Sequence, residues 1–376
     1  MKNQFSLFDL LILIGIIQGV ITGVLLLSSK KNKRSNKFLA LSLFSFCFLS
    51  TKSLLHTLKL WDTPFFRFFP NGIELALPPL IFFYVKSLVN PKLKFQTKNW
   101  FHFLPFFISQ TYSFVVYFAV LKTNDLYQKD IIANNLGFNC IKQIDEYLLL
   151  LSLILYLFFG FKELVKYKKW LSNYTSDSTL PNFLWLERVF YLCVIIGLFL
   201  LVNLSLDILF SFRNKTFMHW DLLMLFITVI IYYLGFTGFL QPDYSFITRL
   251  QKTQKDKSIV KTQKDETILK ALNDAIHIQK VFLNPTINID KLGHILEVTS
   301  RDLSKCINQN YNKSFRDFIN EHRINEVKLK LKSNDYTKKS ILGIATECGF
   351  NSEASFYRIF KKITKKSPKE FIKENQ

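Results

Sequence analysis

The chain has 376 residues and a net charge of +21, and 49% of its residues are hydrophobic. This length accommodates two domains, and the composition changes between Met1–Leu240, which is dominated by Leu, Ile, Val and Phe, and Gln241–Gln376, which carries 26 Lys and Arg against 16 Asp and Glu. The five cysteines are widely spaced without a Cys-x-x-Cys pair, which argues against a disulfide framework and a zinc site. The sequence therefore predicts a membrane part joined to a basic soluble part.

Seven apolar runs in the first part approach the length of about 20 residues that a helix needs to cross a bilayer. The second and third runs are the weaker ones, because they contain Lys52, His56 and Glu74. We expect an all-α fold with an N-terminal bundle of about seven transmembrane helices, six and eight being the alternatives. The runs lie at residues 7–27, 38–58, 73–90, 101–121, 147–165, 189–211 and 220–240.

The connections between the runs predict an orientation, because Lys and Arg remain mainly on the cytoplasmic side. The connections after the first, third and fifth runs, counted together with Lys86 and Lys162 near the ends of two of those runs, carry 14 Lys and Arg, whereas the other set carries 7. The N-terminus is therefore expected outside, and the tail, after seven crossings, in the cytoplasm.

Three ionisable residues in or near the runs are candidates for sensing: Lys52, Glu74 and Asp207. Such groups usually face the protein interior or a polar cavity, where they can bind a ligand or relay protons. The simpler interpretation is structural, with Lys52 paired to Glu74. Pro78-Pro79 in the third run predicts a kink, which either shapes a pocket or is inert packing.

Residues 241–266 are expected to form a basic juxtamembrane linker. The segment Lys-Thr-Gln-Lys-Asp occurs there twice, at Lys252–Asp256 and Lys261–Asp265, which indicates a short duplication rather than a repeat fold. Its lysines can bind anionic lipid headgroups, although a solvated linker is the simpler interpretation. An amphipathic helix is expected from about Thr267, because apolar residues then follow helical spacing at Ile268, Leu272, Ala275 and Ile276.

The segment that follows predicts a first helix-turn-helix unit. Asp290 can start one helix, and Thr299 or Ser300 can cap a second helix that runs through Asn308. The second helix should bury Leu303 and Ile307 while it presents Arg301, Ser304 and Lys305 outward. A long amphipathic helix should then run from Phe315 to near Ser333-Asn334.

A second unit of this kind is predicted in the stretch Gly343–Lys362. Gly349 should supply a left-handed helix cap, and Phe350 should enter the core. Asn351 or Ser352 should cap the next helix, which buries Phe356 and Phe360. Helices of this kind lie in a DNA major groove. The outer face of this helix offers Glu353, Ala354, Tyr357, Arg358 and Lys361.

The tail follows the pattern Ile344-Ala345-x3-Gly349-Phe350-Asn351-Ser352-x2-Ser355-Phe356-x-Arg358-x-Phe360-Lys361-Lys362, then Ser367-Pro368-x2-Phe371. This pattern closely resembles the signature of the AraC/XylS family of transcription regulators. The resemblance covers about 100 residues, from near Leu269 to the end, and includes "SFRDFINEHRI". Departures from the family pattern are Lys365 in place of a usual Gly, Ile372 in place of Arg or Lys, and Ile307 in place of Phe.

The resemblance implies two helix-turn-helix subdomains joined by a long helix, each placing a recognition helix in successive major-groove segments of double-stranded DNA. By motif position, the base-reading candidates are Arg301, Ser304, Lys305, Glu353, Ala354, Tyr357 and Arg358. The phosphate-contact candidates are Thr299, Ser300, Asn351, Ser352, Lys361 and Lys362.

The apolar part also resembles that of multi-pass AraC-type regulators from Bacteroidetes-type bacteria, in "PPLIFFYVKSL" and "HFLPFF". The chain should therefore lie in a bacterial inner membrane. Residues 1–240 are expected to span the membrane, residues 241–266 to form the linker and residues 267–376 to bind DNA.

These features favour a membrane-bound transcription regulator that couples a signal to promoter binding. Motifs for metal-dependent, phosphate-binding or nucleophilic catalysis are missing, so we expect no enzyme, no catalytic residue, no metal and no cofactor. The alternatives are a transporter or membrane enzyme with a regulatory tail, and a regulator whose spans are only an anchor. The expected partners are promoter DNA, the lipid bilayer and a signal ligand, with RNA polymerase and a second copy of the chain as further candidates.

Overall fold

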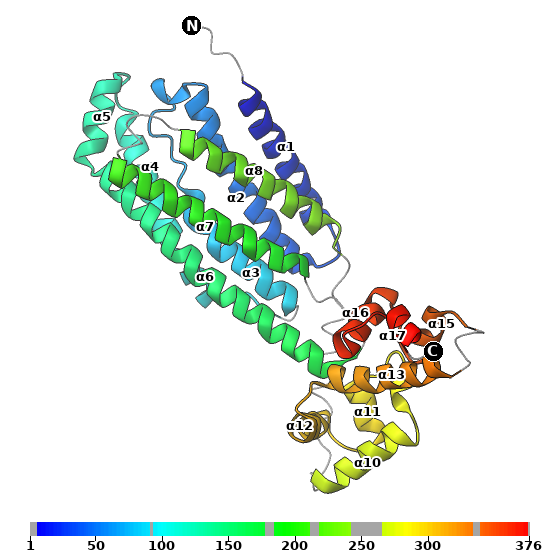
Figure 1. Ribbon diagram of the computed structural model, residues 1–376. Coiled ribbons are helices and arrows are strands. Elements are labelled where there is room, and N and C mark those ends of the chain that lie inside the picture. The colour runs from blue at the N-terminus through cyan, green and yellow to red at the C-terminus, as the bar shows by residue number, and fades with distance from the viewer. Residues whose placement is uncertain are drawn as a thin grey trace. The chain divides into compact units, whose positions relative to one another are not determined.

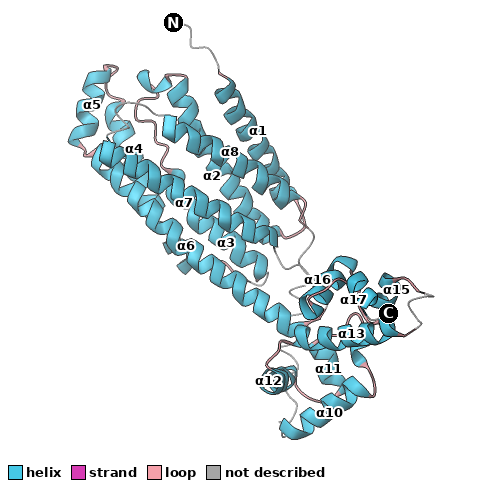
Figure 2. Ribbon diagram, viewed as in Figure 1, coloured by secondary structure: helices cyan, strands magenta, loops and turns pink. Residues whose placement is uncertain are grey.

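The computed structural model describes residues 6–90, 93–176, 184–210, 218–241, 265–333 and 339–374. Within these ranges the regular elements are helices, which confirms the expected all-α fold (Figures 1 and 2). The chain divides into two compact units, Met1–Leu164 with Phe183–Thr248, and Val165–Asn182 with Arg249–Gln376. Residues 242–264 of the expected linker, with most of its duplication, lie outside the described residues.

The first unit contains long apolar helices. Within the described residues, six helical stretches are long and apolar enough to cross a membrane. The shorter elements are α3 (Leu77–Val89), α5 (Leu126–Asn135) and the 3-10 helices η1 (Leu60–Asp62), η2 (Ile73–Ala76) and η3 (Thr97–Phe103). The long helices are α1 (Leu7–Ser28), α2 (Lys33–Thr57), α4 (Leu104–Val120), α6 (Phe138–Tyr174), α7 (Leu184–Phe210) and α8 (Met218–Phe239).

The third expected span departs from the prediction of a full-length helix. Residues 73–90 form η2 followed by α3, which has 13 residues and is almost completely buried. Its length is about 20 Å, which is less than the thickness of a bilayer core. The predicted kink at Pro78-Pro79 is wrong, because both prolines lie in the first turn of α3, where their missing N–H groups are not needed.

Helix α3 nevertheless returns the chain to the end of the bundle where α2 begins. The ring of Phe83 stacks on that of Phe38, with centroids 5.6 Å apart, and Phe38 lies near the start of α2. At the opposite end, Thr57 donates a hydrogen bond to Asp9, so the end of α2 meets the start of α1. The chain therefore alternates between the two ends of the bundle, with α3 as a short crossing between long ones.

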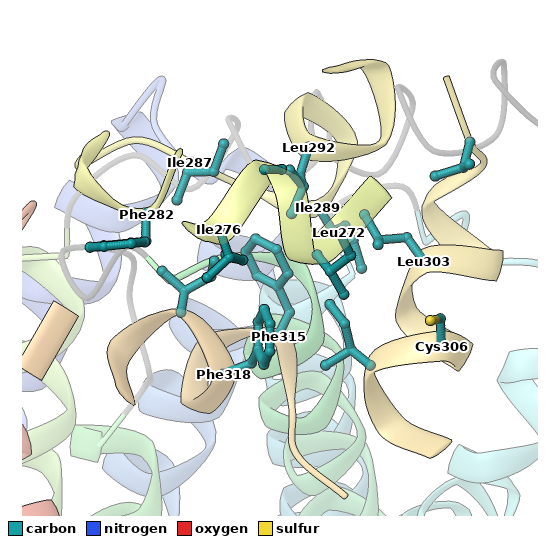
Figure 3. Close-up of a cluster of buried hydrophobic side chains, with 14 of the residues drawn as sticks. Leu272, Ile276, Phe282, Ile287, Ile289, Leu292, Leu303, Cys306, Phe315 and Phe318 are labelled. Atoms are coloured by element: carbon teal, nitrogen blue, oxygen red, sulfur yellow. The ribbon is translucent and has the colours of Figure 1, made fainter. Parts of the chain in front are cut away.

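The second unit has two cores that share the long helix α13 (Phe315–Lys332). The first core lies among α10 (Asp265–His277), η5 (Val281–Leu283), α11 (Ile289–Ile295) and α12 (Ser300–Tyr311). The second lies among α15 (Ile341–Glu347), α16 (Glu353–Thr364) and α17 (Pro368–Glu374). Figure 3 shows the first core, in which Leu272, Leu303 and Phe315 converge from different helices.

Candidate nucleic-acid interface

The first helix-turn-helix unit consists of α11, a four-residue turn and α12. Asn288 caps α11 by accepting the N–H of Lys291 at 2.9 Å, so the helix begins one residue before the predicted Asp290. Thr299 caps α12 through the N–H of Asp302 at 3.0 Å, as predicted. The turn needs Gly293, because a Cβ there would lie 2.8 Å from the carbonyl oxygen of Val298.

Helix α12 turns its apolar side to the core and its polar side to solvent. Arg301 and Lys305 are exposed and Ser304 is half-buried, in agreement with the predicted outer face. The hydroxyl of Ser300, a phosphate-contact candidate, donates to the carboxylate of Asp290. Two of the candidates, Ser300 and Thr299, are therefore engaged in holding the unit together. The buried residues of α12 are Leu303, Cys306 and Ile307.

The second unit follows the prediction at its turn. Gly349 has φ +91°, a left-handed conformation, and Phe350 is buried in the second core. Ser352 occupies the capping position of α16, but its side chain makes no capping hydrogen bond. Lys365 closes α16 with φ 64°, so a lysine adopts the left-handed conformation for which the family pattern has glycine.

Helix α16 buries Phe356 and Phe360 and exposes most of the predicted reading residues. Tyr357 is half-buried, and its ring contacts that of Phe356 at 5.2 Å between centroids. Lys362 is held by Asp317 of α13 at 3.1 Å in an exposed ion pair, which is weak. The exposed candidates of this unit are Asn351, Glu353, Ala354, Arg358, Lys361 and Lys362.

A buried arginine connects the two subdomains. Arg323 of α13 is 1% exposed, and its guanidinium donates to the carbonyls of Phe282 at 2.7 Å and Asn284 at 2.8 Å. A Cβ on Gly349 would lie 2.9 Å from Nε of Arg323 and 2.7 Å from the oxygen of Phe282. The turn of the second unit therefore packs directly on η5 of the first. The sequence analysis missed Arg323, although it lies four residues after the buried Ile319 on the apolar face of its helix.

The last turns of α6 belong to the second unit. Tyr174 is 3% exposed within the first core, and its ring stacks on that of Trp170 with centroids 5.3 Å apart. Thr175 pairs with Asn288, the cap of α11, in a β-bridge, and its carbonyl accepts Nε of Arg316 at 3.0 Å. The sequence analysis missed this contact, because the apolar run predicted there ended at residue 165. The aromatic spacing of Tyr167, Trp170 and Tyr174 was the available signal.

The three sensing candidates do not form one cluster. Lys52 donates to Glu74 at 2.9 Å, as the structural interpretation predicted. Asp207 instead lies beside His219 at 3.0 Å and accepts the indole N–H of Trp220 at 3.2 Å. Lys52 and Glu74 both line a cavity of the first unit, whereas Asp207 is not part of its lining.

Part of the second unit matches a known protein family. Residues 292–374 match the protein family described as "Helix-turn-helix domain". The segment is an AraC-type helix-turn-helix domain. The match begins within α11 and includes α12, the long helix α13 and the second helix-turn-helix unit.

Relatives align over this region. An uncharacterized HTH-type transcriptional regulator of Staphylococcus aureus (strain MSSA476) is 34% identical over 96 residues, which cover 24% of this chain and 12% of that protein. Another such regulator, from Pseudoalteromonas carrageenovora, is 34% identical over 99 residues, or 26% of this chain and 56% of that protein. Their names describe regulators rather than enzymes, which agrees with the expectation from the sequence. A solved structure from Listeria innocua, of unknown function, is 27% identical, covers 29% of this chain and 98% of that one, and has a TM-score of 0.26.

Proposed function

We propose that the chain is a membrane-bound regulator that binds promoter DNA sequence-specifically and couples this binding to a signal received by its membrane part. The AraC-type domain supports DNA binding, because the second helix of each helix-turn-helix unit carries an exposed polar face. This face includes Arg301 and Lys305 on α12 and Arg358 on α16. The six long apolar helices support a multi-pass location in a membrane.

One structural observation supports the proposed coupling between the membrane part and the DNA-binding domain. Helix α6 runs unbroken from Phe138 to Tyr174, begins in the first unit and ends in the core of the second. Its last residues are bound to Asn288, which caps the first helix of the first helix-turn-helix unit. A displacement of α6 would therefore act directly on the start of α11. A membrane part that served only as an anchor would not need this attachment.

The orientation is part of the proposal. The bundle alternates between its ends, so the excess of Lys and Arg in one set of connections favours an outer N-terminus and a cytoplasmic DNA-binding domain. Alkaline phosphatase inserted after Asn124 should then be active in cells, whereas the same insertion after Lys31 should be inactive. The reverse pattern would contradict the orientation.

The central test is DNA binding. Full-length protein in lipid nanodiscs should bind promoter fragments recovered by genome-wide mapping of the tagged chain, with an affinity that falls as salt rises. Arg358→Ala should weaken specific binding by about tenfold or more, as expected for a base-contacting arginine. Lys369→Ala, which removes an exposed charge from α17, should reduce specific and nonspecific binding alike. Full-length protein that ignores DNA at low salt would refute the proposal.

A further inference from the structure

The first unit contains a partly open cavity of about 430 Å³. Its walls are formed by α2, α3, α6, α7 and α8, by Ser113 of α4 and by the segment between α2 and α3. Most of the lining is apolar, with Ile81, Ile196 and Leu223 as examples. Small-molecule sites in proteins are typically concave, about 300–1,000 Å³ in volume and mostly apolar, with a few polar groups that fix the orientation of the ligand.

The polar groups of this cavity form a cluster of hydrogen-bonded pairs. Lys52 donates to Glu74 at 2.9 Å, and Lys142 donates to Ser113 at 2.9 Å. These residues come from the last turns of α2, from η2, from α4 and from the first turns of α6. A molecule in the cavity would therefore meet polar groups at one end and hydrocarbon walls over the rest of its length.

Two buried acceptor oxygens in this cluster have no hydrogen-bond partner among the described residues, Oδ1 of Asn71 and Oε2 of Glu74. Asn71 is only 6% exposed, and its amide nitrogen donates to the carbonyl of Phe48 at 2.8 Å and to the hydroxyl of Thr51 at 3.0 Å. These two bonds fix the side chain so that its oxygen is the free atom. Buried acceptors are normally satisfied, so both oxygens call for a donor from a bound molecule.

The charges of the cluster restrict that donor. The lining contains the cations Lys52, Arg67 and Lys142 and the acidic residues Glu74 and Glu146. Two of the cations are matched by further carboxylates: Lys142 lies 3.1 Å from Asp145, and Arg67 lies 2.7 Å from Asp130. An anionic head group would face the two acidic residues and find these cations already paired, whereas a cationic head group would lie among the three cations. An uncharged hydroxyl or amide N–H avoids both conflicts.

We propose that this cavity binds an uncharged amphiphilic small molecule, whose hydroxyl or N–H groups donate to Asn71 and Glu74 and whose apolar body lies among α3, α7 and α8. The inference rests on the proposed function, because it gives the signal of that function a chemical class. Helix α6 contributes Lys142 and Tyr156 to the cavity wall and carries Tyr174 at its far end. A ligand in the cavity would therefore contact the same helix that reaches α11.

The test uses a photoactivatable alcohol. Full-length protein in lipid nanodiscs is irradiated with 3-azioctanol, an uncharged eight-carbon alcohol that carries a diazirine, and the labelled residues are mapped by mass spectrometry. We expect saturable labelling of lining residues such as Cys193 and Met224, displaced by excess 1-octanol. Octanoate and octylammonium should displace the label at least tenfold less effectively. Labelling that is confined to lipid-facing residues and does not saturate would overturn the site, and stronger competition by either ion would overturn the uncharged class.

Two variants test separately the hydrogen bond to the ligand's head group and the volume of the cavity. Glu74→Gln converts an acceptor into a donor and should weaken labelling about fivefold or more, as expected for the loss of one hydrogen bond to the ligand. Ile196→Trp fills the cavity without changing its polar groups and should abolish saturable labelling. Glu163→Gln, on α6 outside the lining, is the matched control and should label as the parent does. Unchanged helix content by circular dichroism confirms that each variant is folded; a folded Ile196→Trp that still labels saturably contradicts the proposal.

The assay contains no DNA, so its outcome is independent of the proposed function. Saturable labelling in a protein that shows no promoter binding would support the ligand site and contradict the proposed function. A promoter response without cavity labelling would support the proposed function and contradict this ligand site.

Discussion

The guanidinium of Arg323 lies over the ring of Phe350, 5.8 Å from its centroid, and this contact joins the two halves of the DNA-binding domain. Arg323 also holds two carbonyls of the η5 segment, whereas Phe350 belongs to the turn of the second helix-turn-helix unit. Arg323 therefore binds the η5 segment of the first half and contacts the turn before α16 in the second.

Replacement of Arg323 by leucine should destabilise the fragment Asp265–Gln376 by about 1–3 kcal/mol, because the carbonyl of the buried Phe282 would lose its donor. Urea unfolding followed by circular dichroism measures this change. Arg358→Leu, at an exposed position of α16, is the matched control and should change stability by less than about 0.5 kcal/mol. Equal stability of the two variants would show that Arg323 is not structural.

Replacement of Gly349 by alanine should destabilise the same fragment by more than about 1 kcal/mol. Its φ of +91° is unfavourable for any residue with a Cβ. The new Cβ would also lie 2.7 Å and 2.8 Å from two backbone oxygens, which cannot move independently of η5. Gly343→Ala, within α15, meets only the hydroxyl of Ser340 at 3.2 Å and should have a much smaller effect on the melting temperature.

The stability of the domain should fall as the pH drops below about 6.5. Burial, followed by the nearby charge of His277, lowers the pKa of His322, so the unfolded chain binds a proton more readily than the folded domain. The loss therefore begins near the ordinary histidine pKa and continues down to the lowered one. Urea midpoints at pH 5.0, 6.0 and 7.0 measure it. The dependence should be weaker in His322→Gln and retained in His294→Gln, whose ring is exposed on α11.

Replacement of Tyr174 by alanine in the full chain should loosen the first helix-turn-helix unit. The substitution removes a large buried side chain from its core, at a cost of about 2–4 kcal/mol. Hydrogen exchange should become faster in peptides that cover residues 287–296. Tyr191→Ala, at a position of α7 that is 66% exposed, should leave these peptides unchanged. Unaltered exchange in Tyr174→Ala would mean that the end of α6 does not support α11.

Much of the DNA-binding domain was predictable because its signals are local. Leu303, Phe356 and Phe360 recur at helical spacing, and Thr299 and Gly349 mark turns through their own chemistry. The pairing of Lys52 with Glu74 was also anticipated, since two opposite charges near one apolar bundle have few other ways to be satisfied.

The missed features depend on contacts between distant segments. Helix α3 is mostly apolar, so composition could not distinguish a short buried helix from a full span. Thr175 and Asn288 lie far apart in sequence, and the aromatic spacing that precedes Thr175 indicates a buried helix face without identifying its partner. The contact of Ser300 was missed for a similar reason: its hydroxyl is directed to Asp290, in the preceding helix.

The packing of Tyr174 also bears on how the DNA-binding domain would be released from a membrane. A protease that cut the chain once between residues 242 and 264 would separate the domain covalently from α8. The end of α6 would still be buried in its first core, together with Trp170 and the bridge to Asn288. Cleavage at that linker would therefore yield a nicked complex that stays with the membrane fraction, and the domain would become diffusible only when the aromatic packing itself gives way.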